Sequence, residues 1–339
     1  MEHSESDLVL EVLEGCAPFA LREAQRIGRA RVVSPTELRV SGAPIPAAQD
    51  LRRVASAYAS LTVPARRPRE LLETSVQQRI AALWEQIRTQ KPRRRFTGVR
   101  LAAAGADTPD MQRIADALAD LTGLPVADDG DLLARVRRGS GAETWEVLLR
   151  TTPRPLATRP WRAVDYPGAV NATIAASVLD LLEIGPDDAL LDMTCGSGTF
   201  LIEQLHVGAP RRAVGIDISA EALDAAQQHQ RAARQRGRIG WILGDAREVP
   251  LDPGFTRIVM NPPWGMLHGE HEGNAELYRG LLERAAEVAA PNARLGLLTQ
   301  EVRRMRVILA DEALPWRLSG EHMFFQKGHR PRLFLLERA

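Results

Sequence analysis

The segment Asn261-Pro262-Pro263-Trp264 contains the residue types of this chain that are best suited to chemistry. The two prolines fix φ at successive positions and lack an N–H donor, so the carbonyl of Pro262 is left free to accept a hydrogen bond from a ligand. The side-chain oxygen of Asn261 is a second acceptor, and the indole of Trp264 offers a face on which a base can stack. Two acceptors on an exocyclic NH2 draw its lone pair out of conjugation, so the nitrogen can attack an electrophile. The tetrapeptide therefore predicts a site that activates a nucleobase amine, although Asn and Pro also suit an ordinary loop.

A glycine loop lies about seventy residues upstream of this tetrapeptide. Residues 189–192 form an apolar run that leads into Gly196-Ser197-Gly198 and then into an amphipathic helix. This order brings backbone N–H groups and a helix N-terminus to the end of a parallel strand, where ligands bind. Leu201 stands where a dinucleotide-binding fingerprint has its third glycine, which argues against a pyrophosphate cofactor.

Three further predicted strands end near side chains that can bind a ligand. Residues 212–217 end in Asp217, nineteen positions after Gly198, where a carboxylate can accept from two ribose hydroxyls. Residues 239–243 precede Asp245, which can accept from an adenine amine, and residues 257–260 lead into Asn261. An acid of this kind alone is more often a solvated strand end or a helix cap than a ligand contact. Together, their order and spacing predict one ligand site at the edge of a parallel sheet.

This set of residues resembles a class I S-adenosylmethionine-dependent methyltransferase, and Asn-Pro-Pro-aromatic resembles the branch that methylates amino groups. The resemblance spans residues 161–339 and implies a Rossmann-like α/β domain with S-adenosyl-L-methionine as cofactor. It implies that the glycine loop and Asp192 hold the methionine part, Asp217 the ribose and Asp245 the adenine. The implied cofactor-binding residues are Thr173, Asp192, Thr194, Cys195, Gly196, Ser197, Gly198, Thr199, Phe200, Asp217, Ile218, Asp245, Ala246 and Asn261. The implied catalytic residues are Asn261, Pro262, Pro263 and Trp264.

The composition argues against a membrane protein, a secreted disulfide-linked protein and a metalloprotein. The 339 residues are 45% hydrophobic and 26% charged, and the acidic start is unlike a signal peptide, so we expect a cytoplasmic protein with no membrane contact. Cys16 and Cys195 are the only cysteines, which excludes a disulfide framework and a Cys-x-x-Cys zinc site. The run His268-Gly269-Glu270-His271-Glu272 lacks the helical His-Glu-x-x-His spacing, so we expect no metal.

The net charge of +1 conceals an uneven distribution of charge. Residues 62–100 contain ten Arg or Lys and three Glu, whereas residues 104–131 contain seven Asp and one Arg. Such a basic stretch predicts phosphate contacts, although a solvated charge run is the alternative. Phe96 beside the charges favours RNA. The predicted RNA-binding residues are Arg93, Arg94, Arg95 and Arg100.

The N-terminal half alternates short predicted strands and helices. In order, these are strand 8–12, helix 19–27, strand 37–40, helix 46–59, helix 69–89, strand 97–101, helix 108–121, and strands 132–136 and 143–149. The later part of this pattern and the exit Thr158-Arg159-Pro160-Trp161-Arg162 resemble the THUMP domain, a module of RNA-modifying enzymes. The resemblance implies an α+β ferredoxin-like domain in residues 1–64, a THUMP RNA-binding domain in residues 65–159 and a Rossmann-fold methyltransferase domain in residues 160–339.

Residues 165–176 resemble the segment that precedes the methyltransferase strand in THUMP-linked guanine-N2 methyltransferases. Ala172 replaces a common proline, and Trp264 replaces the usual Tyr or Phe. The resemblance implies a monomeric tRNA (guanine-N2)-methyltransferase that acts on a flipped guanosine at position six of the acceptor stem. Two alternatives stay open: a 23S ribosomal RNA guanine-N2 methyltransferase, and a non-catalytic RNA-binding protein with a vestigial methyltransferase fold.

Overall fold

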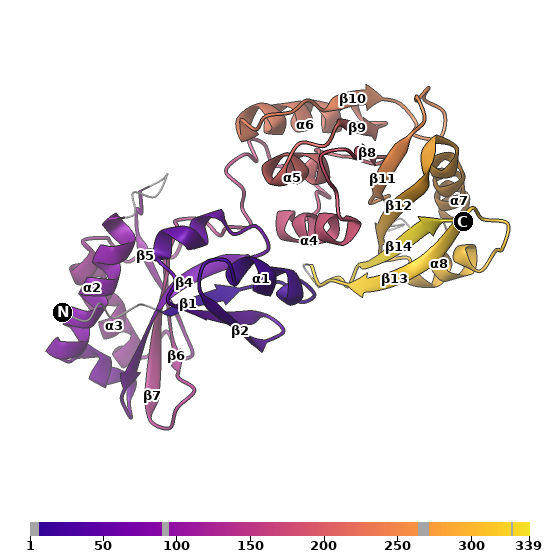
Figure 1. Ribbon diagram of the computed structural model, residues 1–339. Coiled ribbons are helices and arrows are strands. Elements are labelled where there is room, and N and C mark those ends of the chain that lie inside the picture. The colour runs from indigo at the N-terminus through magenta and orange to yellow at the C-terminus, as the bar shows by residue number, and fades with distance from the viewer. Residues whose placement is uncertain (1–6, 90–94, 264–270, 327) are drawn as a thin grey trace. The chain divides into compact units, whose positions relative to one another are not determined.

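The chain folds into two compact units, seen in the computed structural model of Figure 1. The structure describes residues 7–89, 95–263, 271–326 and 328–339. One unit contains Met1–Val12 and Ala17–Thr158, and the other contains Leu13–Cys16 and Arg159–Ala339. Trp264, Arg93 and Arg94, which the sequence places in the predicted sites, lie outside the described residues.

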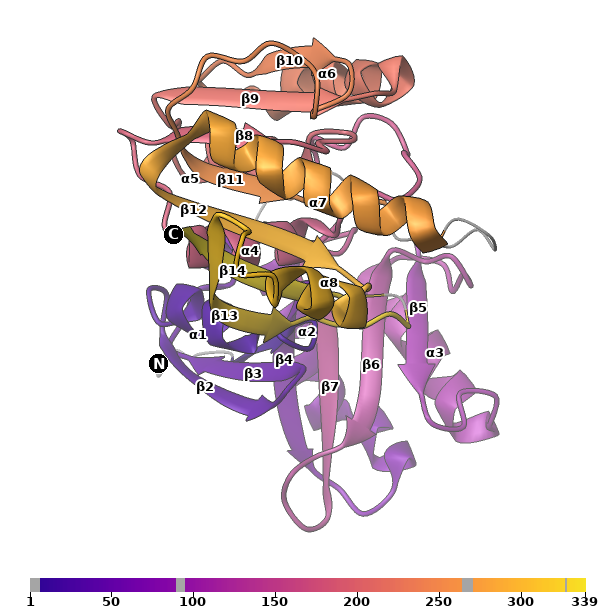
Figure 2. The same cartoon turned by 90° about the vertical axis from the view of Figure 1, so that its right-hand side faces the viewer.

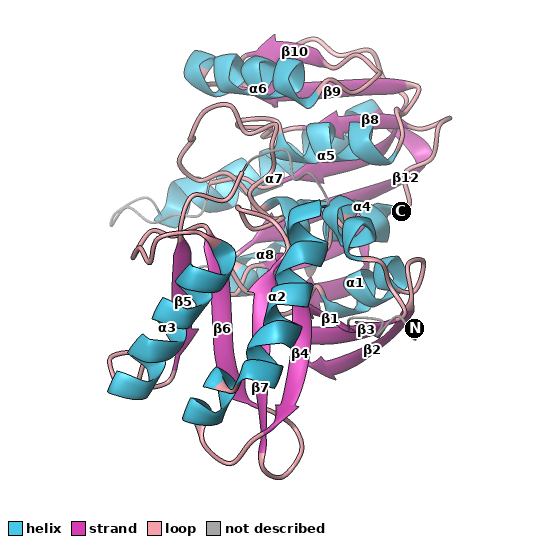
Figure 3. Ribbon diagram, turned by 90° about the vertical axis from the view of Figure 1, so that its left-hand side faces the viewer, coloured by secondary structure: helices cyan, strands magenta, loops and turns pink. Residues whose placement is uncertain are grey.

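The first unit is built on a seven-stranded sheet with the strand order β2-β3-β1-β4-β7-β6-β5. All neighbours are antiparallel except β5 and β6, which are parallel. Figure 3 shows α2 and α3 lying against this sheet. The strands are β1 (Asp7–Glu11), β2 (Arg29–Ser34), β3 (Glu37–Ser41), β4 (Ser56–Pro64), β5 (Val99–Ala103), β6 (Leu132–Arg138) and β7 (Thr144–Arg150). The helices are α1 (Ala17–Ala24), α2 (Thr74–Thr89) and α3 (Pro109–Thr122), with 3-10 turns η1 (Ile45–Asp50) and η2 (Pro68–Leu72).

Two predictions for this unit are wrong. The helix expected over residues 46–59 is instead η1 followed by the central strand β4, whose first five residues are all buried. Burial between two neighbouring strands outweighs the helix propensity of the local alanines. The single helix expected over residues 69–89 is interrupted at Glu73, where the backbone is extended. In addition, the sequence pattern did not predict the strand β2. The strands on both sides of residue 64 share one sheet, and the division at that residue stays a prediction.

The second unit confirms the predicted Rossmann-like α/β fold. Its sheet has the order β10-β9-β8-β11-β12-β14-β13, in which the first five strands are parallel to one another and β14 runs antiparallel to both of its neighbours, β12 and β13. Figures 1 and 2 show α7 and α8 against one face and α4, α5 and α6 against the other. The strands are β8 (Ala189–Asp192), β9 (Arg212–Asp217), β10 (Gly240–Leu243), β11 (Phe255–Met260), β12 (Ala289–Thr299), β13 (Trp316–Met323) and β14 (Arg332–Arg338). The helices are α4 (Ala172–Leu182), α5 (Thr199–Val207), α6 (Ala220–Ala233), α7 (His271–Val288) and α8 (Val302–Leu309).

The strand order of this sheet fixes where a ligand can bind. The order reverses beside β8, because the chain adds β9 and β10 on one side and β11 and β12 on the other. In open α/β sheets, ligands bind outside the carboxyl ends of the strands at such a point. The sheet therefore brings together the residues that follow β8, β9, β10 and β11.

No helix in the described ranges combines the length and apolar composition needed to span a bilayer. Within those ranges, no three His, Cys, Asp or Glu side chains lie together in a way that could hold a metal ion.

Candidate active site

A cavity of about 850 Å³ lies at the carboxyl ends of the parallel strands. Most of the predicted cofactor-binding residues line it: Thr194, Cys195, Gly196, Ser197, Thr199, Phe200, Asp217, Ile218, Asp245, Ala246 and Asn261. Pro262 and Pro263 of the predicted catalytic set line it as well. The strand-end residues that are far apart in the sequence thus surround one space.

The glycine loop between β8 and α5 has a backbone conformation that favours glycine at two positions. Gly196 and Gly198 have φ values of +50° and +80°, in the left-handed region that other residues avoid. A Cβ on Gly198 would also lie 2.6 Å from the indole of Trp241. Around Gly196 no atom of the described residues lies within 4 Å of such a Cβ, so this backbone faces open space. Gly198 is the N-cap of α5, which directs the helix N-terminus at the cavity.

Asp217 ties the end of β9 to the glycine loop. Its Oδ2 accepts from the N–H of Gly196 at 2.8 Å, and its Oδ1 accepts from the N–H of Ser219 at 2.9 Å. A carboxylate has about four acceptor positions, so both oxygens keep a lone pair for ligand hydroxyls. The geometry is therefore compatible with the expected ribose contact.

Asp192 is fully buried at the end of β8, beneath the cavity rather than in its lining. Its Oδ1 accepts from the N–H of Thr194 at 3.3 Å, while Oδ2 has no hydrogen-bond partner among the described residues. Burial, assisted by the charge of Asp217, raises the pKa of Asp192 from 3.8 to about 8, against the lowering effect of the Thr194 hydrogen bond. At neutral pH this carboxyl is therefore protonated in the ligand-free protein.

We expect cofactor binding at pH 7 to release a proton from Asp192. A cationic ammonium group beside this carboxyl would favour its ionised form and lower its pKa. Below about pH 8, cofactor affinity should then rise by up to tenfold per pH unit. Calorimetry in two buffers of different ionisation enthalpy measures the released proton, and Asp192→Asn should abolish the release. A proton release that is unchanged in this variant would assign it to another group.

The same pKa shift also affects the stability of the ligand-free protein. Because the folded-state pKa of Asp192 is raised, its contribution to stability is fully present below the ordinary value of 3.8 and is lost as the pH rises through about 8.

Asp245 lines the cavity as part of an ion pair with Arg247. Its carboxylate accepts from Arg247 Nε at 3.0 Å and Nη2 at 2.6 Å, and from the backbone N–H of Arg247 at 2.9 Å. These hydrogen bonds lower the pKa of Asp245, which keeps it ionised. Gly280 leaves room for Arg247, because a Cβ there would lie 3.1 Å from Cδ of the arginine. Any amine bound by Asp245 would share its oxygens with Arg247.

The Asn-Pro-Pro segment follows β11 directly. The N–H of Asn261 donates to Thr194 Oγ1 at 2.9 Å, which links the segment to the glycine loop. The side-chain oxygen of Asn261 is buried and has no partner among the described residues. Pro262 is buried and Pro263 is exposed. The acceptor predicted to engage an amine is therefore desolvated and unpaired among the described residues.

Two predicted cofactor residues besides Asp192 are absent from the cavity lining. Gly198 acts through the loop conformation described above. Thr173 is fully buried in the first turn of α4, where its N–H and hydroxyl both donate to Oδ1 of the N-cap residue Asn171. These hydrogen bonds indicate that Thr173 stabilises the start of α4.

The predicted sets omitted part of the cavity lining, namely Tyr166, Pro167, Gly168, Ala169, Val170, Met193, Gly244, Arg247, Leu277, Leu281, Gln326 and His329. Residues 165–176 carried a recognisable pattern that could have identified the first five. Gln326 and His329 follow β13, and no local pattern distinguished them.

His229 is a further residue that the sequence did not single out. It is fully buried on α6, with Nδ1 lying 3.1 Å from the carbonyl oxygen of Ser197 and Nε2 lying 3.0 Å from that of Val164. Ser197 belongs to the glycine loop, and Val164 precedes the wall that begins at Tyr166. His229 thus links two sides of the cavity.

The residues present fit S-adenosylmethionine, the cofactor implied by the sequence. The cavity is large enough for a nucleoside with an amino-acid side arm. Three buried polar atoms around it lack partners among the described residues: Asp192 Oδ2, Ser197 Oγ and Asn261 Oδ1. Buried polar groups are usually paired, so these atoms indicate a polar ligand.

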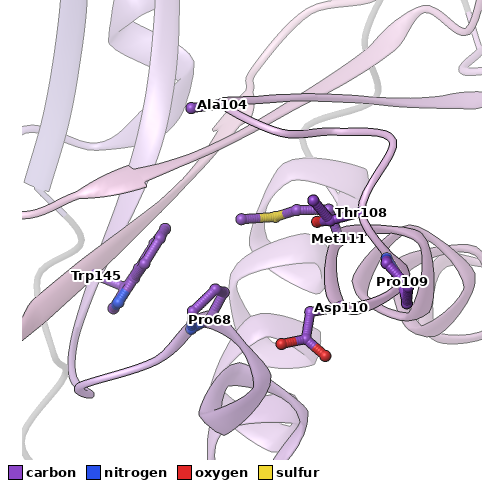
Figure 4. Close-up of a pocket in the computed structure, with 7 residues that line it drawn as sticks. All are labelled: Pro68, Ala104, Thr108, Pro109, Asp110, Met111 and Trp145. Carbon is purple, nitrogen blue, oxygen red and sulfur yellow. The ribbon is translucent and has the colours of Figure 1, made fainter.

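The first unit contains a separate pocket of about 470 Å³ (Figure 4). Trp145, Pro68 and Met111 line it, and the indole N–H of Trp145 has no partner among the described residues. The guanidinium of Arg138 lies 4.7 Å from the centre of the Trp145 ring. Arg95 and Arg100, the predicted RNA contacts that the structure describes, are both exposed.

Comparison with known proteins agrees with this description. Residues 159–331 match the family described as "RMKL-like, methyltransferase domain". A tRNA (guanine(6)-N2)-methyltransferase of Thermus thermophilus is 32% identical over 239 residues, which cover 68% of each chain. The crystal structure of TrmN from Thermus thermophilus has a TM-score of 0.78 at 24% identity and covers 98% of this chain and 99% of its own. A putative methyltransferase solved with SAH has a TM-score of 0.70 at 16% identity and covers 97% of both chains.

Proposed function

Since this chain belongs to the family of RMKL-like methyltransferase domains, we propose that it methylates the exocyclic N2 of a guanosine in tRNA, using S-adenosyl-L-methionine. The observation that carries the proposal is the side-chain oxygen of Asn261, which is buried just after β11, has no partner among the described residues and belongs to the cavity that Asp217 and Asp245 line. The relative with 32% identity bears the name of a guanine-6 N2 enzyme, so position six of the acceptor stem is the proposed target.

We assign separate roles in the reaction to the residues of the cavity. The bound cofactor supplies an electrophilic methyl group. Asn261 Oδ1 and the carbonyl of Pro262 accept from the two N2 hydrogens and so hold the amine lone pair toward that methyl group. Thr194 holds Asn261 in place through the backbone bond at 2.9 Å. Most of the acceleration comes from this positioning, and the proton lost after transfer needs no dedicated base.

The target guanosine must leave its stem to reach a cavity of this kind, which costs a few kcal/mol of unstacking. We propose that residues 65–159 form a THUMP domain and residues 1–64 a ferredoxin-like domain, and that these bind the RNA by its shape and phosphates. Exposed Arg95 and Arg100 support this assignment. We expect a monomer in the cytoplasm, and light scattering after size-exclusion chromatography tests the oligomeric state.

Replacing Arg93, Arg94 and Arg95 by Ala should weaken tRNA binding and reduce its dependence on salt. Each phosphate contact that is lost lowers the slope of log affinity against log salt by about 1. Cofactor affinity should be unchanged. The matched control replaces the exposed Arg234, Arg236 and Arg238, which removes the same charge from the second unit. If tRNA affinity depends equally on salt in both triple variants, Arg93, Arg94 and Arg95 are solvated charges that do not contact RNA.

Mass mapping of modified nucleosides tests the proposed function. A strain that lacks this protein should lose N2-methylguanosine at position six of its tRNA, and the purified protein should restore it. If the methyl group is missing from 23S ribosomal RNA instead, the protein is a ribosomal RNA enzyme. If no nucleoside changes in either RNA and no methyl transfer occurs in vitro, the fold is vestigial.

A further inference from the structure

Four residues from early in the chain belong to the unit that contains the cavity. Leu13–Cys16 lie between β1 and α1, yet they cluster with residues 159–339. A hydrogen bond from the N–H of Cys16 to the carbonyl of Leu13, at 2.8 Å, closes them into a turn. The unit that carries the cavity is thus assembled from two separate stretches of the chain.

One side of this turn packs against the end of β13. The N–H of Phe325 donates to the carbonyl of Glu14 at 3.1 Å, and Nε2 of His322 donates to the carbonyl of Gly15 at 2.7 Å. Gly15 has a φ of +92°, and a Cβ on it would lie 2.2 Å from the carbonyl oxygen of Met323. Both the conformation and the close approach require glycine.

The other side of the turn packs against the start of α4. Cys16 is fully buried, and its Sγ lies 4.0 Å from the carbonyl oxygen of Thr173. Thr173 is in the first turn of α4, which Asn171 caps. The turn therefore contacts two elements that are more than a hundred residues apart.

These two elements meet again in the wall of the cavity. Gln326 Oε1 accepts from the N–H of Asn171 at 3.3 Å, and Gln326 is joined to His329 by two backbone hydrogen bonds of 2.8 and 2.9 Å. Val170, Gln326 and His329 all line the cavity. The turn supports this wall through Phe325, which directly precedes Gln326, and through Thr173, three residues after Val170.

We propose that Leu13–Cys16 is a positioning element of the methyl-transfer cavity, which holds the start of α4 and the segment after β13 in register. The expected effect on the rate of methyl transfer rests on the proposed function. The packing of Leu13–Cys16 against α4 and the end of β13 rests on the geometry alone. A misplacement of about 1 Å at a reacting centre can slow a reaction by about 10²-fold, so a displaced wall should have a measurable effect.

Gly15→Ala tests the proposal in the full-length protein. We expect the thiol of Cys16 to react with a maleimide at least about tenfold faster, because the thiol is now exposed, and single-turnover methyl transfer to fall by about tenfold. Mass spectrometry of peptides separates Cys16 from Cys195. Gly123→Ala is the matched control, since Gly123 also has a positive φ, +69°, but no described atom lies within 4 Å of an added Cβ. It should leave both measurements within about twofold of the unmodified protein.

His322→Ala provides a second route if Gly15→Ala does not fold, because it removes the hydrogen bond to Gly15 without straining the backbone. Rapid labelling of Cys16 together with slow methyl transfer in either variant supports the proposal. Unchanged methyl transfer with an exposed Cys16, or slow transfer with Cys16 still protected, would overturn it. If the unmodified protein transfers no methyl group to tRNA, the proposed function fails, while the labelling still decides whether the turn is docked.

Discussion

Asn261→Ala should lower the rate of methyl transfer by about 10³-fold while the affinities for cofactor and tRNA stay nearly constant. The substitution removes the side-chain oxygen that is buried and unpartnered among the described residues. It keeps the backbone N–H that donates to Thr194, so the Asn-Pro-Pro segment should hold its position. An interaction made chiefly in the transition state changes the rate rather than the binding, and single-turnover kinetics with separate binding assays measure both.

Asn292→Ala is the matched control for this prediction. Asn292 is exposed on β12 and does not line the cavity, so its loss should leave the rate unchanged. A rate for Asn261→Ala within about tenfold of the unmodified protein would mean that another group orients the amine.

Asp217→Ala should weaken cofactor binding on the order of 100-fold. Two charge-assisted hydrogen bonds to the ribose would be lost, each contributing about 1.5 to 3 kcal/mol, and relaxation of the site would offset part of this loss. The variant also loses the acceptors for the N–H groups of Gly196 and Ser219. Calorimetry with S-adenosylmethionine and with S-adenosylhomocysteine should give the same relative loss, because the two ligands share the ribose.

The control for Asp217 is Asp252→Ala, an exposed acid beyond the cavity. Thermal unfolding of both variants shows whether the loop has come apart, since Asp217, unlike Asp252, accepts a hydrogen bond from the glycine loop. A folded Asp217→Ala protein with undiminished cofactor affinity would remove Asp217 from the site.

The parallel part of the second unit was predictable from local sequence. Each strand from β8 to β11 is a short apolar run with a polar residue at or just after its end, and the chain places β9 and β10 on one side of β8 and β11 on the other. Connections between parallel strands obey strict rules of handedness, so the order of Asp192, Asp217, Asp245 and Asn261 in the sequence implies their meeting in space. Gly196 and Gly198 are recognisable from local sequence, because glycine is favoured at positive φ values such as theirs.

The features that sequence reasoning missed depend on contacts between distant segments. Residues 56–64 are a strand because β1 and β7 pair with them on either side, and their composition gave no sign of this. Likewise, Gln326 and His329 reach the cavity only because β14 pairs with β12 and brings the segment after β13 beside α4.

Local backbone preferences and strand order were enough to predict where the candidate site lies, because a glycine loop, a proline pair and a strand-end acid are each recognisable from their own residues. Tertiary structure alone decided how those groups are tuned. Burial sets the pKa of Asp192, and the turn at Gly15 packs against Met323, more than three hundred residues away. Desolvation and packing depend on every segment that covers a group, and these segments are not neighbours in the sequence.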